Sequence, residues 1–375
     1  MAWALSEQQF ILSGTRQVFG TACSVFLKPS FGPRCWFTNC WIFLNKIALG
    51  EKVKQNKRPE SFFYLANLIS LWAGLIFIIF CQIIFHNFMR PENLKTKIFL
   101  DSGDPNETRE AIKILGFLDG QTTNPTLMAR NPEAMARLER GEKFSQKEVY
   151  DFYRNVVEKI SAMIPGGSIS IEVYADAKTP AKEMLAQAKE MASWISNAHI
   201  KLPITIVGLE AASEVIKAGA RVNMTLCFSQ VQAAAVYAAT RGAKKGDVFV
   251  SPFVGRLDDH DENGMDLIKN ILKMYEAGDG HVEALVASVR NIEHFLWSLA
   301  LGADIITAPL KILKEWTENG SIVSSYDYAY DAKNLKEITY QDININGFWQ
   351  NFNLFHELTD KGLERFSQDW NALIG

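Results

Sequence analysis

Short apolar runs alternate with longer amphipathic segments from Lys97 to about residue 319. Continuous apolar runs are typical of strands buried on both faces, as in parallel sheets. The longer segments carry apolar residues at intervals of three and four, which is the spacing of one face of a helix. Eight strands are predicted in this way, at 98–101, 120–122, 169–174, 200–204, 222–228, 248–253, 284–289 and 304–307.

Helices are predicted between these strands, for example at 181–195 and at 210–217, where Gly219 suits a helix C-terminus. Eight strand–helix units in about 220 residues indicate an α/β protein with a (β/α)8 barrel, the TIM-barrel fold. A doubly wound open sheet is the alternative. The segment 101–105 after the first strand lacks the glycine-rich turn that such sheets commonly carry there, so the barrel is favoured.

Residues 320–375 continue beyond the eighth unit of the barrel, which is expected to span 89–319. A polar, Tyr/Asn-rich stretch leads to a predicted helix at 359–373. Asp360 and Glu364 lie in its first turns, where acidic residues suit the helix dipole. We expect this C-terminal tail and its helix to pack on the barrel and to help close its site.

The first 88 residues have a different pattern. The 29 residues 61–89 contain no Asp, Glu, Lys or Arg, and about 20 apolar residues suffice to span a bilayer. Two interpretations of this N-terminal extension of residues 1–88 stay open: a transmembrane helix at 61–88 that anchors the protein, or translation that begins at Met89, with residues 1–88 absent from the mature protein. The second is favoured, because residues 1–50 show no sustained helical or alternating pattern and sequence of a globular kind begins only at Lys97.

Composition supports this division. The net charge of the chain is -3, but residues 1–88 carry eight basic and three acidic residues, and the remainder carries 31 basic and 39 acidic ones. The remainder is thus near -8, which argues against nucleic-acid binding. Four of the five cysteines also lie in the first 88 residues, and Cys227 stands alone after them. The barrel is accordingly expected in the cytoplasm, or anchored to a membrane and facing the cytosol.

Lys201 interrupts the apolar strand at 200–204. Because side chains alternate along a strand, Ile200 and Leu202 are expected to face the helices and Lys201 the inside of the barrel. Burial disfavours the charged form of a lysine, and a neutral amine can attack a carbonyl to form a Schiff base. The alternatives are a lysine that extends from the strand end to solvent and one that forms a structural ion pair.

Two carboxylates, Glu172 and Asp101, lie at the ends of two other predicted strands. Either could be a structural ion partner of Lys201, but two of them around one buried lysine suit an acid/base pair. On the fifth strand Asn223 and Thr225 face the same side. Further polar or aromatic candidates follow the strand ends: Asn124, which could also cap a helix, Ser251, Phe253, Arg256, Ser288 and Arg290.

Arg256, Ser288 and Arg290 together resemble a phosphate clamp, although a surface salt bridge is the commoner role of a lone arginine. The acidic segment 258–262 lacks the spacing of a calcium loop and is expected to be solvated. No metal site is predicted, because the six histidines show no ligand spacing. His199 is expected to face outward.

Seven segments in chain order, one near each successive strand end, resemble the transaldolase family, including its short members and fructose-6-phosphate aldolase. They are Phe99-Leu100-Asp101, Thr122-Thr123-Asn124-Pro125, Ile171-Glu172-Val173, Ile200-Lys201-Leu202-Pro203, Asn223-Met224-Thr225-Leu226, Ser251-Pro252-Phe253-Val254-Gly255-Arg256 and Ala287-Ser288-Val289-Arg290. The tail from Leu358 to Trp370 also resembles the closing helix of the family.

The resemblance implies transfer of a dihydroxyacetone unit between sugar phosphates in the non-oxidative pentose phosphate pathway, without metal or organic cofactor. Lys201 would form the Schiff base, Glu172 and Thr225 would hold a proton-shuttling water, and Asp101 would move the proton of the C4 hydroxyl. The remaining candidates would bind substrate: Asn124, Asn223, Ser251 and Phe253 near the dihydroxyacetone unit, and Arg256, Ser288 and Arg290 at the phosphate.

Aldolase-type relatives tend to have Gln and Tyr where this chain has Glu172 and Phe253, so the resemblance favours a transferase over an aldolase that releases free dihydroxyacetone. A third alternative is a membrane-tethered sugar-phosphate binder without catalytic activity. A homo-oligomer is compatible with the sequence. No nucleic-acid partner is expected, and a membrane partner only if the 61–88 segment is part of the protein.

Overall fold

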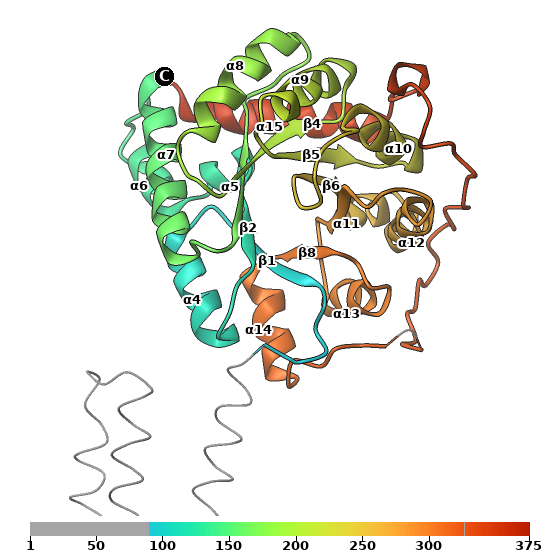
Figure 1. The fold of residues 1–375 in the computed structure, drawn as a ribbon. Coiled ribbons are helices and arrows are strands. Elements are labelled where there is room, and N and C mark those ends of the chain that lie inside the picture. The colour runs from blue at the N-terminus through green and yellow to red at the C-terminus, as the bar shows by residue number, and fades with distance from the viewer. Residues whose placement is uncertain (1–89, 326) are drawn as a thin grey trace, which may run out of the picture. The chain divides into compact units, whose positions relative to one another are not determined.

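The computed structural model of the chain describes residues 90–325 and 327–375. Its eight strands are all parallel, and each is hydrogen-bonded to the next until β8 pairs with β1 and closes a barrel. Figure 1 shows the helices around this barrel. The predicted (β/α)8 fold is confirmed. The strands are β1 (Lys97–Asp101), β2 (Gly120–Thr122), β3 (Ser168–Glu172), β4 (Ala198–Pro203), β5 (Val222–Cys227), β6 (Val248–Pro252), β7 (Val282–Val286) and β8 (Ile305–Ala308).

Amphipathic helices pack around the strands and bury their apolar faces against the outer side of the barrel. They are α4 (Pro105–Leu115), α5 (Pro125–Ala129), α6 (Pro132–Glu139), α7 (Gln146–Met163), α8 (Ala181–Ala192), α9 (Ile206–Lys217), α10 (Gln230–Ala239), α11 (Val254–Asp258), α12 (Gly264–Tyr275), α13 (Ile292–Ala300), α14 (Leu310–Glu318) and α15 (Glu357–Leu373).

Helix α9 begins four residues before the predicted start at residue 210. The side chain of Thr205 accepts a hydrogen bond from the backbone N–H of Gly208 and so caps the helix directly after β4. The strand was predicted at 200–204, and the cap at Thr205, directly after it, was not predicted. At the other end Gly219, with φ +80°, lies just past the helix, as expected.

The inside of the barrel is filled by aromatic side chains at the N-terminal ends of the strands. Phe249 packs edge-on against Phe99 and is stacked on the ring of His199 at 4.0 Å between centroids. The prediction that His199 faces outward is therefore wrong, because residues 199 and 201 are two apart on one strand and point to the same side. The ring nitrogens of His199 are hydrogen-bonded to the Ser168 hydroxyl and to the Gly246 carbonyl.

The tail after α14 runs along the outside of two barrel helices. The carbonyls of Ile338 and Gln341 accept hydrogen bonds from Asn270 on α12 and Gln230 on α10. The chain then enters α15, which packs against α5 and β5 and lies across the barrel in Figure 1. The tail therefore brings a helix distant in sequence to the edge where the strands end.

Within the described ranges, no helix is long and apolar enough to cross a membrane. The segment 61–88, one interpretation of which is a transmembrane helix, lies outside these ranges.

Candidate active site

A cavity of about 650 Å³ lies at the C-terminal ends of the strands, the end at which TIM barrels carry their active sites. Its walls come from strand ends, from the loops that follow them and from α15. Eight of the eleven predicted site residues line it: Asp101, Asn124, Lys201, Ser251, Phe253, Arg256, Ser288 and Arg290. The other three do not line it: Glu172, Asn223 and Thr225. Glu172 contacts the lining residue Lys201, and Asn223 contacts the lining residue Ser251.

Lys201 points into the barrel from β4, as predicted, and its side chain is 4% exposed. Its Nζ lies 3.0 Å from Oε2 of Glu172 and donates to the carbonyl of Thr123 at 3.3 Å. Glu172 and Asn223 are its register neighbours on β3 and β5. The amine is therefore buried, paired with one carboxylate and open to the cavity.

Glu172 is as deeply buried as the lysine. Desolvation raises the pKa of its carboxyl, and the charges of Lys201 and Arg256 oppose that rise. Its backbone N–H donates to the hydroxyl of Tyr153, which is also hydrogen-bonded to Thr123. A carboxylate with a raised pKa accepts a proton more readily than a solvated one, so Glu172 suits proton exchange with the neighbouring amine.

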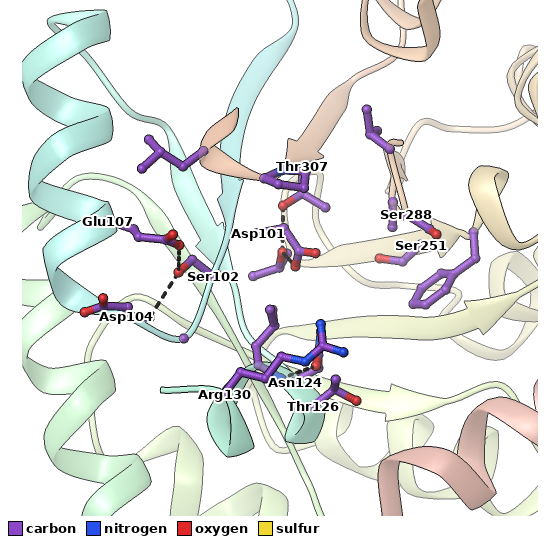
Figure 2. A pocket seen from close by; sticks show the side chains of 18 of the residues that line it. Asp101, Ser102, Asp104, Glu107, Asn124, Thr126, Arg130, Ser251, Ser288 and Thr307 are labelled. Carbon is purple, nitrogen blue, oxygen red and sulfur yellow. Dashed lines mark hydrogen bonds between the residues drawn. The ribbon is translucent and has the colours of Figure 1, made fainter. Parts of the chain in front are cut away.

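Asp101 ends β1 and receives a hydrogen bond of 2.7 Å from the hydroxyl of Thr122. Burial raises the pKa of its carboxyl, while Lys201 and the Thr122 hydroxyl lower it. Figure 2 shows Asp101 below Thr307, with Ser251 and Ser288 to one side. The site thus holds the amine of Lys201 together with two carboxyl groups, and burial raises the pKa of both carboxyls.

Asn223 lies beneath the cavity wall, with its side-chain amide occupied on both sides. Its Nδ2 donates to Ser170 at 3.0 Å, and its Oδ1 accepts from Ser251 at 2.6 Å. This arrangement holds the Ser251 hydroxyl against Asn223 on the neighbouring strand β5. The predicted direct contact of Asn223 with a substrate would require that pair of hydrogen bonds to rearrange.

Thr225 is fully buried on β5. Among the described residues, its Oγ1 and the Oε2 of Glu172 are two of the three buried side-chain atoms without a hydrogen-bond partner in the protein. The contact of that Oε2 with Lys201 is an ion pair at 3.0 Å. Buried polar atoms of this kind are the usual partners of ordered water.

Asn124 has both roles that the sequence suggested. Its Oδ1 accepts a hydrogen bond of 2.9 Å from the backbone N–H of Leu127 and caps α5. The residue also lines the cavity, and Figure 2 shows it beside Thr126 and Arg130. The cap holds the side chain in place and leaves its amide NH2 for a ligand.

Arg256 and Arg290 lie at one end of the cavity. The guanidinium of Arg256 lies over the rings of Phe253 and Phe366, at 5.3 and 5.4 Å from their centroids. Burial and then the positive charges of Arg365 and Arg290 lower its pKa. The side chain of Arg290 forms a 2.8 Å ion pair with Asp259.

The backbone at this end is shaped for close approach. A Cβ on Gly255 would lie 2.3 Å from both the Arg290 side chain and the Ser288 carbonyl, so only glycine fits there. Ser288 has φ +59°, a strained conformation for a residue with a side chain and one that is often found at ligand sites. Two guanidiniums and a hydroxyl held in this way could bind a phosphate.

Several lining residues were not predicted from the sequence, among them Arg130, Lys311, Arg365 and Phe366. Arg365 and Phe366 belong to α15, whose place over the barrel could be anticipated only as a tail that closes the site. Arg130 and Lys311 are exposed residues on the rim. A lone basic residue on a helix has no distinctive signal in one sequence.

The acidic segment 258–262 is only partly solvated. Asp258 accepts from the ring of His294 at 2.7 Å and from the backbone of Gly264, and Asp259 binds Arg290. Within the described part of the chain, no group of three His, Cys, Asp or Glu residues is placed to hold a metal ion.

Comparison with known proteins gives a consistent result. Residues 98–375 match the family model described as transaldolase/fructose-6-phosphate aldolase. A protein named probable transaldolase from Dehalococcoides mccartyi is 35% identical over 277 residues, which are 74% of this chain and 99% of that protein. Proteins of the same name from Sulfurihydrogenibium sp. and Brucella ovis are 35% and 34% identical, over 74% and 73% of this chain and 97% and 96% of their own length. The chain belongs to the transaldolase/fructose-6-phosphate aldolase family.

Proposed function

We propose that this protein is a transaldolase. It transfers a dihydroxyacetone unit from sedoheptulose 7-phosphate or fructose 6-phosphate to glyceraldehyde 3-phosphate or erythrose 4-phosphate, in the non-oxidative pentose phosphate pathway. The observation that carries the proposal is the buried amine of Lys201, 3.0 Å from the Glu172 carboxylate, in a cavity that Asp101 and two arginines also line.

The first step is formation of a Schiff base. The Nζ of Lys201 attacks the C2 carbonyl of the ketose phosphate, and the carbonyl oxygen leaves as water. Glu172 takes two protons from the nitrogen in turn, one that frees the amine from the ammonium and one after the attack, and passes each of them to the departing oxygen, which therefore leaves as water. Each proton travels through a water molecule that also binds the hydroxyl of Thr225. Burial raises the pKa of Glu172, and this supports both halves of that exchange.

Asp101 then starts the cleavage of the C3–C4 bond. Its carboxylate takes the proton of the C4 hydroxyl, C4 becomes the aldehyde carbon of the departing aldose phosphate, and the electrons of the C3–C4 bond move into the iminium. The lysine-bound three-carbon enamine then attacks the aldehyde of the acceptor through C3. Asp101 returns its proton to the new alkoxide. Hydrolysis of the new iminium frees Lys201.

Binding groups surround this chemistry. The Asn124 amide and the Ser251 hydroxyl hold the hydroxyls of the dihydroxyacetone unit, with Asn223 orienting Ser251 and Phe253 forming an apolar wall. Arg256, Ser288 and Arg290 bind the phosphate. Holding both substrates in one geometry supplies much of the rate acceleration expected of such a site.

A trapping experiment tests the covalent step. Borohydride reduction in the presence of fructose 6-phosphate should attach one three- or six-carbon adduct to Lys201, located by peptide mass spectrometry. Lys201→Arg keeps a positive charge beside Glu172 and should lose both labelling and activity. Lys97 is the matched control, because it also points into the barrel and is paired with Glu283, and it should stay unlabelled. An active Lys201→Arg variant, or an adduct elsewhere, contradicts the mechanism.

Assays with and without an acceptor aldose phosphate distinguish a transferase from an aldolase. Glu172 and Phe253, in place of the Gln and Tyr of aldolase-type relatives, support the transferase. Fructose 6-phosphate alone should give little free dihydroxyacetone, and adding erythrose 4-phosphate should give rapid formation of sedoheptulose 7-phosphate. Release of dihydroxyacetone at the same rate with and without acceptor contradicts the transferase proposal.

For the location we propose the cytoplasm, with a membrane-anchored enzyme facing the cytosol as the alternative. Cys227 supports this location. It is the one cysteine among the described residues, and its thiol is buried and forms no disulfide, which suits a reducing compartment. Fractionation of cells with an antibody against the barrel tests this proposal.

A further inference from the structure

We propose that Arg365, on the C-terminal helix α15, is a third phosphate-binding residue of the cavity and makes the site select phosphorylated aldoses over unphosphorylated ones. The proposal rests on the proposed function, since it concerns the acceptor and donor sugars of the same site. It was not foreseen from the sequence, where the phosphate clamp was limited to Arg256, Ser288 and Arg290.

The first observation is that Arg365 lies at the wall of the cavity. Arg365 and the next residue, Phe366, both line the cavity. The ring of Phe366 lies 5.4 Å from the guanidinium of Arg256 and 6.0 Å from Nζ of Lys201. Gly362 lies three residues before Arg365, on the same face of α15, and a Cβ there would lie 2.7 Å from the guanidinium of Arg256. Arg365 therefore enters the cavity on the side of α15 that faces Arg256.

The second observation is that α15 is held firmly against the barrel. The buried hydroxyl of Thr359 donates to the carbonyl of Leu226 at 3.0 Å and accepts from Gln232 at 2.8 Å. At the other end Asp369 accepts a hydrogen bond from Thr126 on α5. The backbone of Arg365 lies between these two anchors, so its side chain is presented from a fixed element, which favours tight and specific binding.

The third observation is the balance of charge. Within the described ranges, Arg256 has no carboxylate within ion-pair distance, and Arg290 has Asp259 at 2.8 Å. Among the described residues, Arg365 has only Asp369 as an ion-pair partner, at 3.8 Å from its Nε; the Arg365 side chain is exposed and the Asp369 side chain is partly buried. Three guanidiniums therefore share two carboxylates, and the charges of Arg365 and Arg290 add to burial in lowering the pKa of Arg256.

This excess of positive charge matches a dianion. A phosphate monoester offers three oxygens and close to two negative charges, so it can accept hydrogen bonds from several guanidiniums at once. An unphosphorylated sugar offers only hydroxyls. These do not neutralise the three positive charges, and they do not offset the free-energy cost of removing water from the guanidiniums. Arg365 should therefore strengthen binding of the phosphorylated sugar and leave the unphosphorylated one unaffected.

The direct test is calorimetric titration of the purified protein with inorganic phosphate, which requires no turnover. We expect Arg365→Gln to weaken phosphate binding about tenfold, the effect of losing one charged hydrogen bond, and Arg365→Lys to recover part of it. Lys361→Gln is the matched control. It removes a positive charge one turn away on α15, where Lys361 is paired with Glu357 outside the cavity, and it should leave phosphate binding unchanged. Equal binding by wild type and Arg365→Gln overturns the proposal, as does an equal loss in Lys361→Gln.

The selectivity is read from kinetics. For transfer from fructose 6-phosphate, kcat/KM with erythrose 4-phosphate should fall about tenfold in Arg365→Gln, and kcat/KM with unphosphorylated erythrose should not change. An equal fall with both acceptors indicates a structural effect and overturns the proposal. Failure of the proposed function is distinct from this result, because a protein without any transfer activity can still be titrated with inorganic phosphate.

Discussion

Thr225 is a single buried residue at which stability and activity are expected to respond in opposite directions. Its hydroxyl has no hydrogen-bond partner in the protein, and an unsatisfied buried hydroxyl costs stability. Thr225→Val keeps the shape of the side chain, so we expect the free energy of unfolding to stay equal or to rise by about 1 kcal/mol. If the hydroxyl holds the proton-shuttling water, kcat should fall about tenfold or more.

Urea unfolding and steady-state kinetics on the same preparation check this prediction for Thr225. The control is Thr307→Val, which removes a hydroxyl that is bonded to Thr122 at 2.6 Å and should lower stability. A Thr225→Val variant with unchanged kcat would mean that the hydroxyl has no part in proton transfer.

Asp101 provides a pH-dependent prediction, also at the scale of single residues. Burial raises the pKa of its carboxyl, and the hydroxyl of Thr122 partly lowers it again. As a base, Asp101 must be deprotonated, so activity is lost as pH falls through this raised pKa. Thr122→Val removes the hydrogen bond to the carboxylate and should raise the Asp101 pKa further.

The measurement is the profile of kcat/KM against pH with fructose 6-phosphate as donor. In Thr122→Val the acidic limb should move to higher pH, and the plateau at high pH should change much less. A limb that stays in place, or moves to lower pH, would show that Asp101 is not the base that controls it.

Helix α15 covers part of the cavity, and Gly362 lies in close contact with the barrel. A Cβ at this position would lie 2.6 Å from the side chain of Leu226 and 2.7 Å from the guanidinium of Arg256. Gly362→Ala must therefore displace the helix, or else both the Leu226 side chain and the Arg256 guanidinium. Although alanine favours a helix by about 1 kcal/mol over glycine, we expect a higher KM for fructose 6-phosphate with no gain in Tm.

Gln368→Ala is the matched control for Gly362→Ala, since it changes an exposed side chain on the same helix. It should leave KM and Tm nearly unchanged. If Gly362→Ala raises Tm and leaves KM unaltered, the close approach of α15 to Arg256 is not important for substrate binding.

At the scale of the whole molecule, the closed barrel, its tail and every proposed site residue lie within residues 90–375. We therefore predict that a chain beginning at Met89 folds cooperatively, remains in solution and has the kcat of the full chain. Thermal unfolding and transferase assays on both chains check this prediction. Loss of folding in the shorter chain would mean that residues 1–88 contribute to the stability of the barrel.

The net charge near -8 after residue 88 also belongs to this scale. It repels sugar phosphates at long range, so they must be attracted by the local arginines of the cavity. The overall charge argues against a nucleic-acid partner, and it does not reveal the positive site within the acidic surface.

Much of the fold and of the site was predictable because the signals are local. Apolar runs located all eight strands, since a strand buried on both faces must be apolar along its length. The same rule made Lys201 conspicuous, and alternation correctly placed it inside the barrel. The prediction that His199 faces outward is wrong because His199 and Lys201 are two residues apart on one strand, and alternation places both side chains inside the barrel.

Other features depend on contacts between distant parts of the chain. The pairing of Lys201 with Glu172 follows from the register of β3 and β4, and the engagement of Asn223 with Ser251 follows from the closeness of β5 and β6. The sequence by itself determined the barrel, the inward lysine and the polar residues at the strand ends, because periodicity and burial are properties of short segments. Only the tertiary structure decided that α15 brings Phe366 over Lys201 and Arg365 to the wall of the cavity, because that position depends on packing between residues more than a hundred apart in the chain.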